Sequence, residues 1–261
     1  MSAYDKVQAA RDSKRLTAVD YISRMFGSSF IELHGDRRFG DDKAIVGGLA
    51  MLYDQPVTVI GIEKGRTTKE RMSRNFGSAN PEGYRKALRL MKQAEKFHRP
   101  VLCLVDTSGA YPGIGAEERG QGLAIAENLM EMMTLKTPIL SILIGEGGSG
   151  GALALAVADE VWMLEDSIYS VISPEGCASI LWKDSTKAPE ASECLKLTSH
   201  NLFDLGVVER IIREPSDIDD RKMFEGLKML ISRTFEKNMN VDVNTLTQER
   251  YERFRKLGNN V

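Results

Sequence analysis

Two segments, VLCLVDTSGAYPGIGAEERGQ at 101–121 and TPILSILIGEGGSGGALALAVA at 137–158, decide the fold. Each begins with an apolar run that predicts a buried strand and continues into a glycine-rich loop and a helix. Such a loop gathers unpaired main-chain N–H groups at the start of a helix, where they bind negatively charged oxygen. The sequence therefore predicts two loops, Asp106–Gly120 and Gly145–Gly151, that carry the chemistry with backbone amides.

Strands and helices alternate along the rest of the chain. Ala44–Leu52 and Val57–Ile62 predict two buried strands joined by a turn, and Pro81 opens a helix that runs to about Phe97. This order indicates an α/β protein, and the early hairpin and short later helices favour strand–strand–helix turns over one open doubly wound sheet. Further strands are expected at 161–165, 169–172 and 207–212, and further helices at 18–25, 150–158, 173–182 and 190–197.

The segment Glu118–Thr134 predicts a helix beside the first loop. Its apolar residues recur at helical spacing, so we expect one face to point inward. That inward stripe comprises Leu123, Ala126, Leu129, Met130 and Met133. Glu117 and Glu118 adjoin the loop, and we interpret them as acidic residues that favour a helix N-terminus rather than as catalytic groups.

Length and composition describe one globular domain over residues 1–261, with an N-terminal helical segment at 1–28 and a C-terminal helical region at 215–261. Apolar residues make up 42% and charged residues 28% of the chain, and the net charge is −2, so nothing global points to nucleic acid or to an acidic membrane surface. No apolar segment has the length of a membrane span or of a signal sequence, and a cytoplasmic protein is expected.

The three cysteines, Cys103, Cys177 and Cys194, form no C-x-x-C pair. A disulfide framework and a structural zinc site are therefore not expected, and no metal site is predicted. The segment Lys64–Asn75 is rich in Lys and Arg and has two interpretations: a solvated loop or helix start, or a surface that binds an anion or a partner.

The glycines at 145–151 match two motifs that must be weighed against each other. Gly145, Gly147 and Gly150 fit the dinucleotide-binding pattern G-x-G-x-x-G, with Glu165 about twenty positions on, which would make the chain an oxidoreductase. The predicted crossover helix is short for that fold. A phosphate-binding P-loop is excluded because no Lys follows the loop.

The second motif is G-x-S-x-G, the nucleophile elbow of serine hydrolases, centred on Ser149. A hydrolase triad needs a histidine after the acid, and the only later histidine is His200, in the polar segment LTSHNLF. A lone histidine in such a segment is more often a surface residue than a base.

A third interpretation uses both loops together. Small residues let main-chain N–H groups approach a developing oxyanion, and each donor is worth roughly 3–4 kcal/mol. The residues of the required type are Gly109 and Ala110 in the first loop and Gly150 and Gly151 in the second. We expect Gly151→Val to fill the pocket rather than the core, and so to abolish activity while the fold survives.

Several longer motifs carry a family resemblance that covers roughly Phe30–Pro215. DDKAIVGGLA, KGRTTKE, NFGSANPEGYRKALRLM, DTSGAYPGIGAEERGQ, IGEGGSGGALALAVAD and YSVISPEGCASILWK resemble the carboxyltransferase alpha subunits of bacterial acetyl-CoA carboxylases. One departure is Ser108, which stands where the family usually has proline in its TPGAYPG loop. The change alters the stiffness of the loop but keeps the neighbouring Gly109 and Ala110 amides.

The resemblance implies a crotonase-type (ClpP/crotonase) spiral of ββα turns with flanking helices, in a heterotetramer of two alpha and two beta subunits. The beta subunit of that family has a zinc ribbon and binds acetyl-CoA, which agrees with the absence of zinc-binding cysteines here. The implied reaction moves the carboxyl group of carboxybiotin to acetyl-CoA and gives malonyl-CoA, the first committed step of fatty acid synthesis. Carboxybiotin arrives on a biotin carboxyl carrier protein, no cofactor is attached to this chain, and a separate biotin carboxylase consumes the ATP.

The resemblance also assigns site residues. The ureido nitrogen of biotin removes the acetyl proton, so the protein supplies positioning and oxyanion donors rather than a base. Lys64, Arg66 and Lys69 then become candidates for contact with the carrier or with CoA. The implied backbone donors are Gly109, Ala110, Gly150 and Gly151, and the implied carboxybiotin pocket comprises Gly147, Gly148, Tyr111, Pro112 and Gly113.

Overall fold

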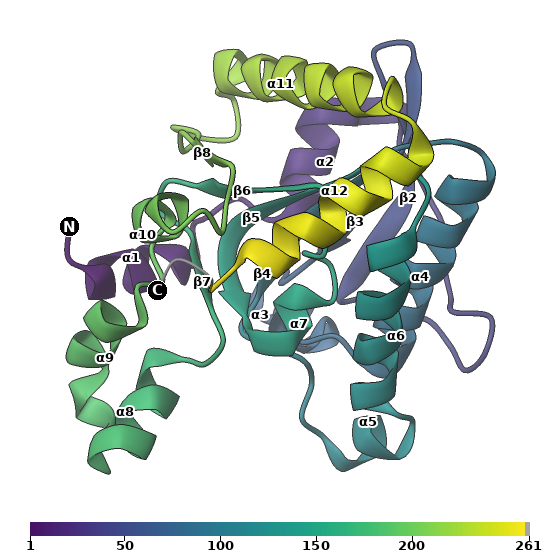
Figure 1. The fold of residues 1–261 in the computed structure, drawn as a ribbon. Helices are drawn as coiled ribbons and strands as arrows, with labels where there is room; N and C mark the ends of the chain where they lie inside the picture. The colour runs from purple at the N-terminus through teal and green to yellow at the C-terminus, as the bar shows by residue number, and fades with distance from the viewer. Residues whose placement is uncertain (259–261) are drawn as a thin grey trace.

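The computed structural model describes residues 1–258, and an eight-stranded sheet lies at its centre (Figure 1). The strands follow the order β1-β2-β3-β4-β5-β6-β8, and β7 pairs with the far end of β5. Their bounds are β1 Ile31–Glu32, β2 Ile45–Leu52, β3 Gln55–Ile62, β4 Val101–Thr107, β5 Ile139–Gly148, β6 Glu160–Leu164, β7 Ile168–Ser170 and β8 Arg210–Ile212.

The sheet is mixed, and the change of direction comes early. β2 and β3 form an antiparallel hairpin in which Ile45 faces Ile62 and Leu52 faces Gln55, which confirms the two predicted strands. From β3 onward the neighbours β4, β5, β6 and β8 are parallel. Parallel strands need long crossover connections, and helices supply them between β3 and β4 and between β4 and β5.

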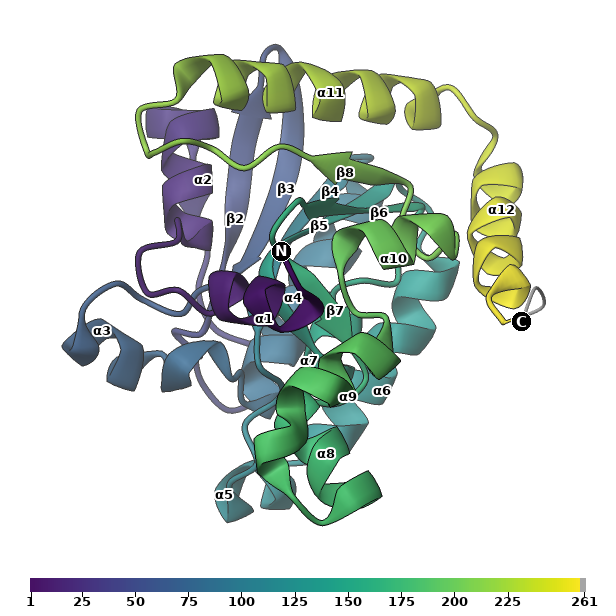
Figure 2. The ribbon, with the colours of Figure 1, turned by 90° about the vertical axis from the view of Figure 1, so that its left-hand side faces the viewer.

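Helices cover both faces of the sheet (Figures 1 and 2). On one face, α4 and α6 pack side by side over apolar residues of β2 to β5, and on the other face α2 and α11 pack over the alternate residues of the same strands. The helix bounds are α1 Ala3–Ala10, α2 Ala18–Phe26, α3 Thr68–Ser73, α4 Pro81–Lys96, α5 Ile114–Glu118, α6 Gln121–Thr134, α7 Ser149–Leu153, α8 Pro174–Trp182, α9 Ala188–Leu195, α10 Ser199–Asp204, α11 Arg221–Met239 and α12 Val243–Lys256. Three short 3-10 segments lie at Gly27–Ser29, Asn75–Gly77 and Ser185–Lys187.

The predicted C-terminal helical region is present as α11 and α12, and its last three positions, 259–261, lie outside the described residues. α11 crosses the sheet and packs on α2, where the rings of Tyr21 and Phe224 meet edge to face at 5.5 Å. α12 returns to the opposite side of the molecule. Its Arg250 is 1% exposed and donates to Asp159 at 2.8 Å and to the carbonyl of Met132 at 2.6 Å.

The predicted helix Glu118–Thr134 differs from the structure in two ways. It is divided into α5 and α6 at Gly120, and only Leu129 and Met133 of its predicted inward stripe pack against the core, where they are half-buried. The buried residues of α6 are Gln121, Ala124, Asn128 and Met132, whereas Leu123 and Met130 are 66% and 74% exposed. α6 packs on α4, and its fully buried positions are mainly small or polar residues rather than the larger apolar ones.

The predicted second loop is mostly strand. β5 continues through Gly145–Gly148, where Gly147 pairs with Thr107 of β4 and with Tyr169 of β7, and α7 begins at the next residue. The absence of side chains permits this: a Cβ on Gly145 would meet the carboxylate of Asp106, and a Cβ on Gly147 would meet Leu143. α7 is also shorter than the predicted helix at 150–158 and ends at Leu153.

Candidate active site

The first glycine loop begins where β4 ends. Thr107 is the last residue of the strand, and Gly109 follows with φ of 146°, a conformation that residues with a side chain rarely adopt. The hydroxyl of Thr107 accepts the N–H of Gly109 at 3.0 Å and donates to the carbonyl of Gly109 at 2.8 Å. Thr107 therefore holds the turn that presents Ala110.

The two glycine segments meet backbone to backbone. A Cβ on Gly148 would collide with the carbonyl of Ser108, and a Cβ on Gly151 would lie 2.6 Å from the nitrogen of Ala110. Both positions require glycine because the main chain of the first loop occupies the space of a side chain. The expectation that a valine at position 151 would fill the pocket is corrected, since its side chain would strike the first loop and the hydroxyl of Tyr84, 2.9 Å from the Cβ position.

The predicted donors differ in how their N–H groups are used. That of Gly109 is already bound to Thr107. Gly150 and Gly151 belong to the first turn of α7, where N–H groups have no carbonyl within the helix. Within residues 1–258, Ala110 has no hydrogen bond from its N–H to another group. Three of the four predicted amides, those of Ala110, Gly150 and Gly151, can therefore donate to a ligand.

A cavity of about 300 Å³ opens beside the start of α7. Its lining is mostly apolar and consists of Ser149, Gly150, Leu153, Tyr169, Ser170, Val171, Leu202 and Val207. Burial raises the pKa of Tyr169 to about 12, so its hydroxyl stays protonated. A cavity of this size and character accommodates a small ring, and Gly150 is the predicted donor that lines it.

The residues implied for the carboxybiotin pocket do not all lie at one place. Gly147 and Gly148 line a smaller recess of about 20 Å³ with Ser108 and Glu146, on the other side of the second segment. Tyr111 is 38% exposed and its ring lies over Gly113, where a Cβ would collide with it. Neither these two residues nor Pro112 are among those that line the apolar cavity.

Charged residues hold the strand ends beneath the glycines. Lys64 pairs with Asp106 at 2.6 Å, and the same carboxylate accepts the N–H of Glu146 at 2.8 Å. Arg11 of the α1–α2 connection pairs with Glu146 at 2.7 Å and with Glu175 at 2.8 Å. The ends of β4 and β5 are therefore joined by a network of ion pairs that begins in the N-terminal segment.

The basic segment Lys64–Asn75 contains the short helix α3. Lys64 is committed to Asp106, and Arg66 pairs with Asp20 at 2.6 Å. Lys69 is exposed and has no ion pair with any of residues 1–258. Of the three cations considered for a partner contact, Lys69 is the one that no carboxylate within the described chain engages.

The two motif-based alternatives lack their required geometry. Ser149 has φ of 50°, as a nucleophile elbow would, but no histidine of the described chain forms a hydrogen bond with it, and His200 lies exposed in α10. For a dinucleotide site, Gly145 and Gly147 lie within β5 rather than in a turn, and α7 has five residues, too few for a Rossmann crossover.

Over residues 1–258, no helix is long and apolar enough to cross a membrane. In the same residues, no group of three or more His, Cys, Asp or Glu side chains is placed to hold a metal ion.

Two buried residues at this site were missed from the sequence. Tyr84 of α4 is fully buried beside Gly151, and its hydroxyl has no partner within residues 1–258. Gln121 is 3% exposed and donates to two main-chain carbonyls, that of Tyr111 in the first loop and that of Ala79 just before α4. The available signal was positional, because each lies in the first turn of its helix, Tyr84 in α4 and Gln121 in α6.

Comparison with known proteins finds close relatives along the whole described chain. The family model described as acetyl co-enzyme A carboxylase carboxyltransferase-like matches residues 1–258. The acetyl-coenzyme A carboxylase carboxyl transferase subunit alpha of Ruminiclostridium cellulolyticum is 63% identical over 258 residues, which are 99% of this chain and 98% of that protein. The subunit of the same name from Clostridium perfringens is 58% identical over 262 residues, covering 99% and 96%.

Solved structures with a similar fold are more distant in sequence. A chain of a Pseudomonas malonate decarboxylase hetero-tetramer, in complex with coenzyme A, has a TM-score of 0.70 at 16% identity and covers 94% of this chain and 99% of its own. A transcarboxylase 12S chain has a TM-score of 0.68 at 21% identity, and this chain spans 43% of it while 85% of this chain is covered. These similarities show the fold alone, and the fold is crotonase-like α/β, as expected.

Proposed function

This chain belongs to the family of acetyl-coenzyme A carboxylase carboxyltransferase alpha subunits, and we propose that it contributes half of each site at which carboxybiotin carboxylates acetyl-CoA. The product is malonyl-CoA, which is consumed in fatty acid synthesis. We take residues 1–261 as one carboxyltransferase domain, with an N-terminal helical segment at 1–28 and a C-terminal helical region at 215–261. Carboxybiotin, brought by the carrier protein, supplies the carboxyl group and a ureido nitrogen that accepts the acetyl proton.

One observation carries the assignment of the site. The two glycine segments touch through their main chains, so that the free N–H groups of Ala110, Gly150 and Gly151 belong to one small region beside an apolar cavity. In this proposal these amides hold the oxygen that becomes negative as the carboxyl group leaves. Preorganised donors of this kind lower a barrier by roughly 3–4 kcal/mol each.

The other predicted residues shape the loop or bring the two segments together. Gly109 provides the turn, since Thr107 already engages its N–H. Gly147 and Gly148 keep β5 close enough to the first loop for the two segments to meet, and Tyr111, Pro112 and Gly113 form the exposed rim of that loop. The cavity beside Gly150 is the part of this chain that fits the apolar ring of carboxybiotin.

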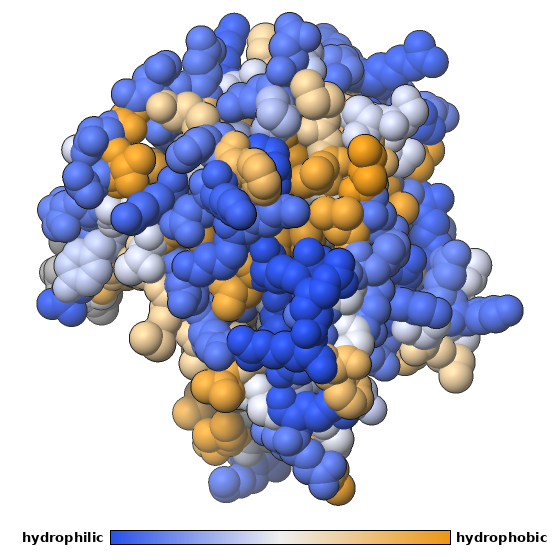
Figure 3. Space-filling view, turned by 90° about the vertical axis from the view of Figure 1, so that its right-hand side faces the viewer, coloured by the Kyte–Doolittle hydropathy of each residue, from blue (hydrophilic) through white to orange (hydrophobic). Residues whose placement is uncertain are grey.

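Exposed apolar side chains near the site support a partner subunit. Ile114 of α5 is 79% exposed, and Leu123 and Met130 of α6 are exposed on the same side. Figure 3 shows orange side chains gathered at the lower end of the face that these helices help to form. Ile180 and Leu181 of α8 are also exposed, at 63% and 59%, but α8 lies on the other side of the lower part of the molecule from α5 and α6 (Figure 1). Large apolar groups exposed together mark interaction surfaces.

We take the occupant of this surface to be a beta subunit with a zinc ribbon that binds acetyl-CoA, in an assembly of two alpha and two beta chains. The biotin carboxyl carrier protein and biotin carboxylase complete the cytoplasmic enzyme. Lys69, free of ion pairs with residues 1–258, remains a candidate for contact with the carrier or with CoA.

The test is a reconstitution. Transfer of labelled carboxyl groups from carboxybiotinylated carrier to acetyl-CoA is measured with this chain, with the beta subunit, and with both together. We expect malonyl-CoA only from the mixture. An inactive mixture would overturn the function, and turnover by this chain alone would contradict the shared site.

A further inference from the structure

The turn that leads into and begins α4, residues 79–85, contacts both glycine segments. On the first-loop side, the N–H of Tyr111 donates to the carbonyl of Ala79 at 3.1 Å. On the second-segment side, the hydroxyl of Tyr84 lies beside Gly151. Both glycine segments are therefore positioned by their contacts with this turn.

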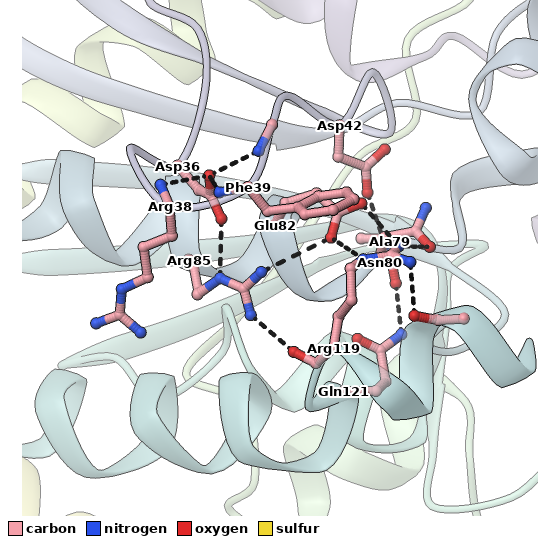
Figure 4. A network of polar contacts seen from close by, with 12 residues as sticks. Asp36, Arg38, Phe39, Asp42, Ala79, Asn80, Glu82, Arg85, Arg119 and Gln121 are labelled. Carbon is pink, nitrogen blue, oxygen red and sulfur yellow. Dashed lines mark hydrogen bonds and ion pairs between the residues drawn. The ribbon is translucent and has the colours of Figure 1, made fainter.

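Gln121, the first residue of α6, fastens the first loop to that turn. Its side-chain amide donates to the carbonyl of Ala79 at 2.8 Å (Figure 4) and to the carbonyl of Tyr111 at 2.9 Å. The carbonyl of Ala79 thus accepts both from Gln121 and from the main chain of Tyr111. Tyr111, the residue after Ala110, is therefore held through both its N–H and its carbonyl.

The position of Gln121 is itself fixed by its neighbour Arg119. The Arg119 guanidinium binds Glu82 of α4 at 2.9 Å and lies over the ring of Phe39 at 4.6 Å from the centroid (Figure 4). The carbonyl of Arg119 accepts from Arg85 at 3.0 Å, and Arg85 pairs with Asp36 at 2.9 Å. The junction between α5 and α6 is therefore tied to α4 through both its side chain and its main chain.

The hydrogen bonds of the Gln121 side-chain amide indicate a specific role. Both donors are satisfied, whereas its buried carbonyl oxygen has no partner within residues 1–258. An unpaired buried acceptor costs stability, so an apolar side chain of similar size would be favoured if only packing mattered. The residue instead supplies one donor to the loop beside Ala110 and one to the carbonyl of Ala79, which the same loop also contacts.

We propose that Gln121 is a positioning residue for carboxyl transfer, which sets the distance between the Ala110 and Gly151 amides by clamping the first loop to α4. The inference rests on the proposed function of these amides. Gln121 does not touch the reacting groups, and it acts through the main chain of Tyr111.

Two substitutions in the alpha–beta complex separate donation from packing. Gln121→Met keeps the volume and removes both donors, so we expect kcat to fall roughly 10- to 100-fold, as for a misplaced catalytic group, while KM changes less than about 3-fold. Gln121→Glu cannot donate when ionised but donates one hydrogen bond when protonated. Its kcat, relative to wild type, is expected to rise as the pH falls from about 8 to 6, a response that Gln121→Met lacks.

The charged groups around position 121 are Asp42, Glu82, Arg85 and Arg119, and they are common to all variants, so the ratio to wild type removes their titration. Gln248 of α12 is an exposed glutamine, and its Met and Glu variants are the matched controls, with kcat and its pH profile expected to equal wild type.

A second readout does not need activity. The N–H of Tyr111 is protected by Ala79, so its hydrogen exchange is expected to accelerate about 10-fold or more in Gln121→Met at unchanged melting temperature. Wild-type kcat and unchanged exchange in both variants would overturn the positioning role, as would a loss of kcat that only follows lost stability. If the wild-type complex transfers no carboxyl group, the proposed function fails, whereas the exchange result still decides whether Gln121 clamps the loop.

Discussion

The main chain of Ala110 lies so close to Gly151 that a Cβ at position 151 would be 2.6 Å from the Ala110 nitrogen. Its neighbour Gly150 has room, because a Cβ there would lie 3.7 Å from Ile125, an ordinary contact distance. Adjacent glycines in one short helix therefore serve different ends: Gly151 allows two backbones to meet, and Gly150 opens the wall of a cavity.

Replacing Gly151 by alanine tests this close approach. The methyl group forces the first loop away, so we expect kcat/KM to fall about 100-fold and the protein to lose roughly 1–3 kcal/mol of stability, as in overpacked cores. Carboxyl transfer by the reconstituted complex and thermal unfolding of this chain measure the two effects. Gly226→Ala is the control: its Cβ meets nothing within 4 Å, so full activity and a gain of about 0.5–1 kcal/mol are expected. Wild-type kcat/KM for Gly151→Ala would contradict the packing argument.

Tyr84 buries a hydroxyl that has no partner within residues 1–258, and burial raises its pKa so that it stays protonated. Removing an unpaired polar group relieves its desolvation cost, so Tyr84→Phe is expected to be neutral or to stabilise the chain by up to about 1–2 kcal/mol in urea unfolding. Tyr169→Phe, at a half-buried tyrosine that lines the apolar cavity, is the comparison variant. A loss of more than 1 kcal/mol at position 84 would mean that the hydroxyl has a partner in solution.

Asp36 links acid stability to the network in Figure 4. Burial alone raises its pKa, but the N–H groups of Arg38, Phe39 and Gly40 and the Arg85 guanidinium outweigh burial and hold the pKa at about 2. Because the folded value lies below the unfolded value near 3.8, the carboxylate stabilises the fold above about pH 4. That stability is lost as the pH falls toward 2.

The shift corresponds to about 2 kcal/mol, so Asp36→Asn is expected to lose that amount at pH 7 and clearly less at pH 3, measured by urea unfolding at both values. Asp54→Asn, in the exposed turn between β2 and β3, is the control and should change little at either pH. A loss for Asp36→Asn that stays the same at pH 3 and pH 7 would exclude the charge as its cause.

The exposed apolar face of α6 makes a prediction about assembly. Leu123→Lys and Met130→Lys each remove an apolar group worth about 1.5–3 kcal/mol when buried, so binding to the beta subunit is expected to weaken roughly 10- to 100-fold. The fold should be unaffected, because both side chains already face away from α4. Met229→Lys, on the exposed side of α11, is the matched control. Unchanged affinity of both α6 variants, measured by calorimetry, would show that the beta subunit binds elsewhere.

Most strands of the sheet and most of the helices around it could be predicted from local patterns. The hairpin of β2 and β3 follows from two apolar runs joined by a polar turn, and the start of α4 follows from Asn80 and Pro81. The orientation of α6 could not be predicted, because apolar residues at helical spacing do not reveal whether their neighbour is the core or another subunit.

The glycines at 145–151 show what the sequence determines and what only the tertiary structure decides. The sequence by itself determined that small residues occur at 109–110 and 145–151, that His200 is the only histidine after Ser149, and which family the motifs resemble. The tertiary structure decided that Gly145–Gly148 is strand. It also decided that Gln121 of α6 contacts the first loop and that Tyr84 of α4 lies beside Gly151. The physical reason is that the choice between loop and strand at a glycine depends on hydrogen-bond partners distant in sequence, here Thr107 and Tyr169, which only the assembled sheet brings alongside.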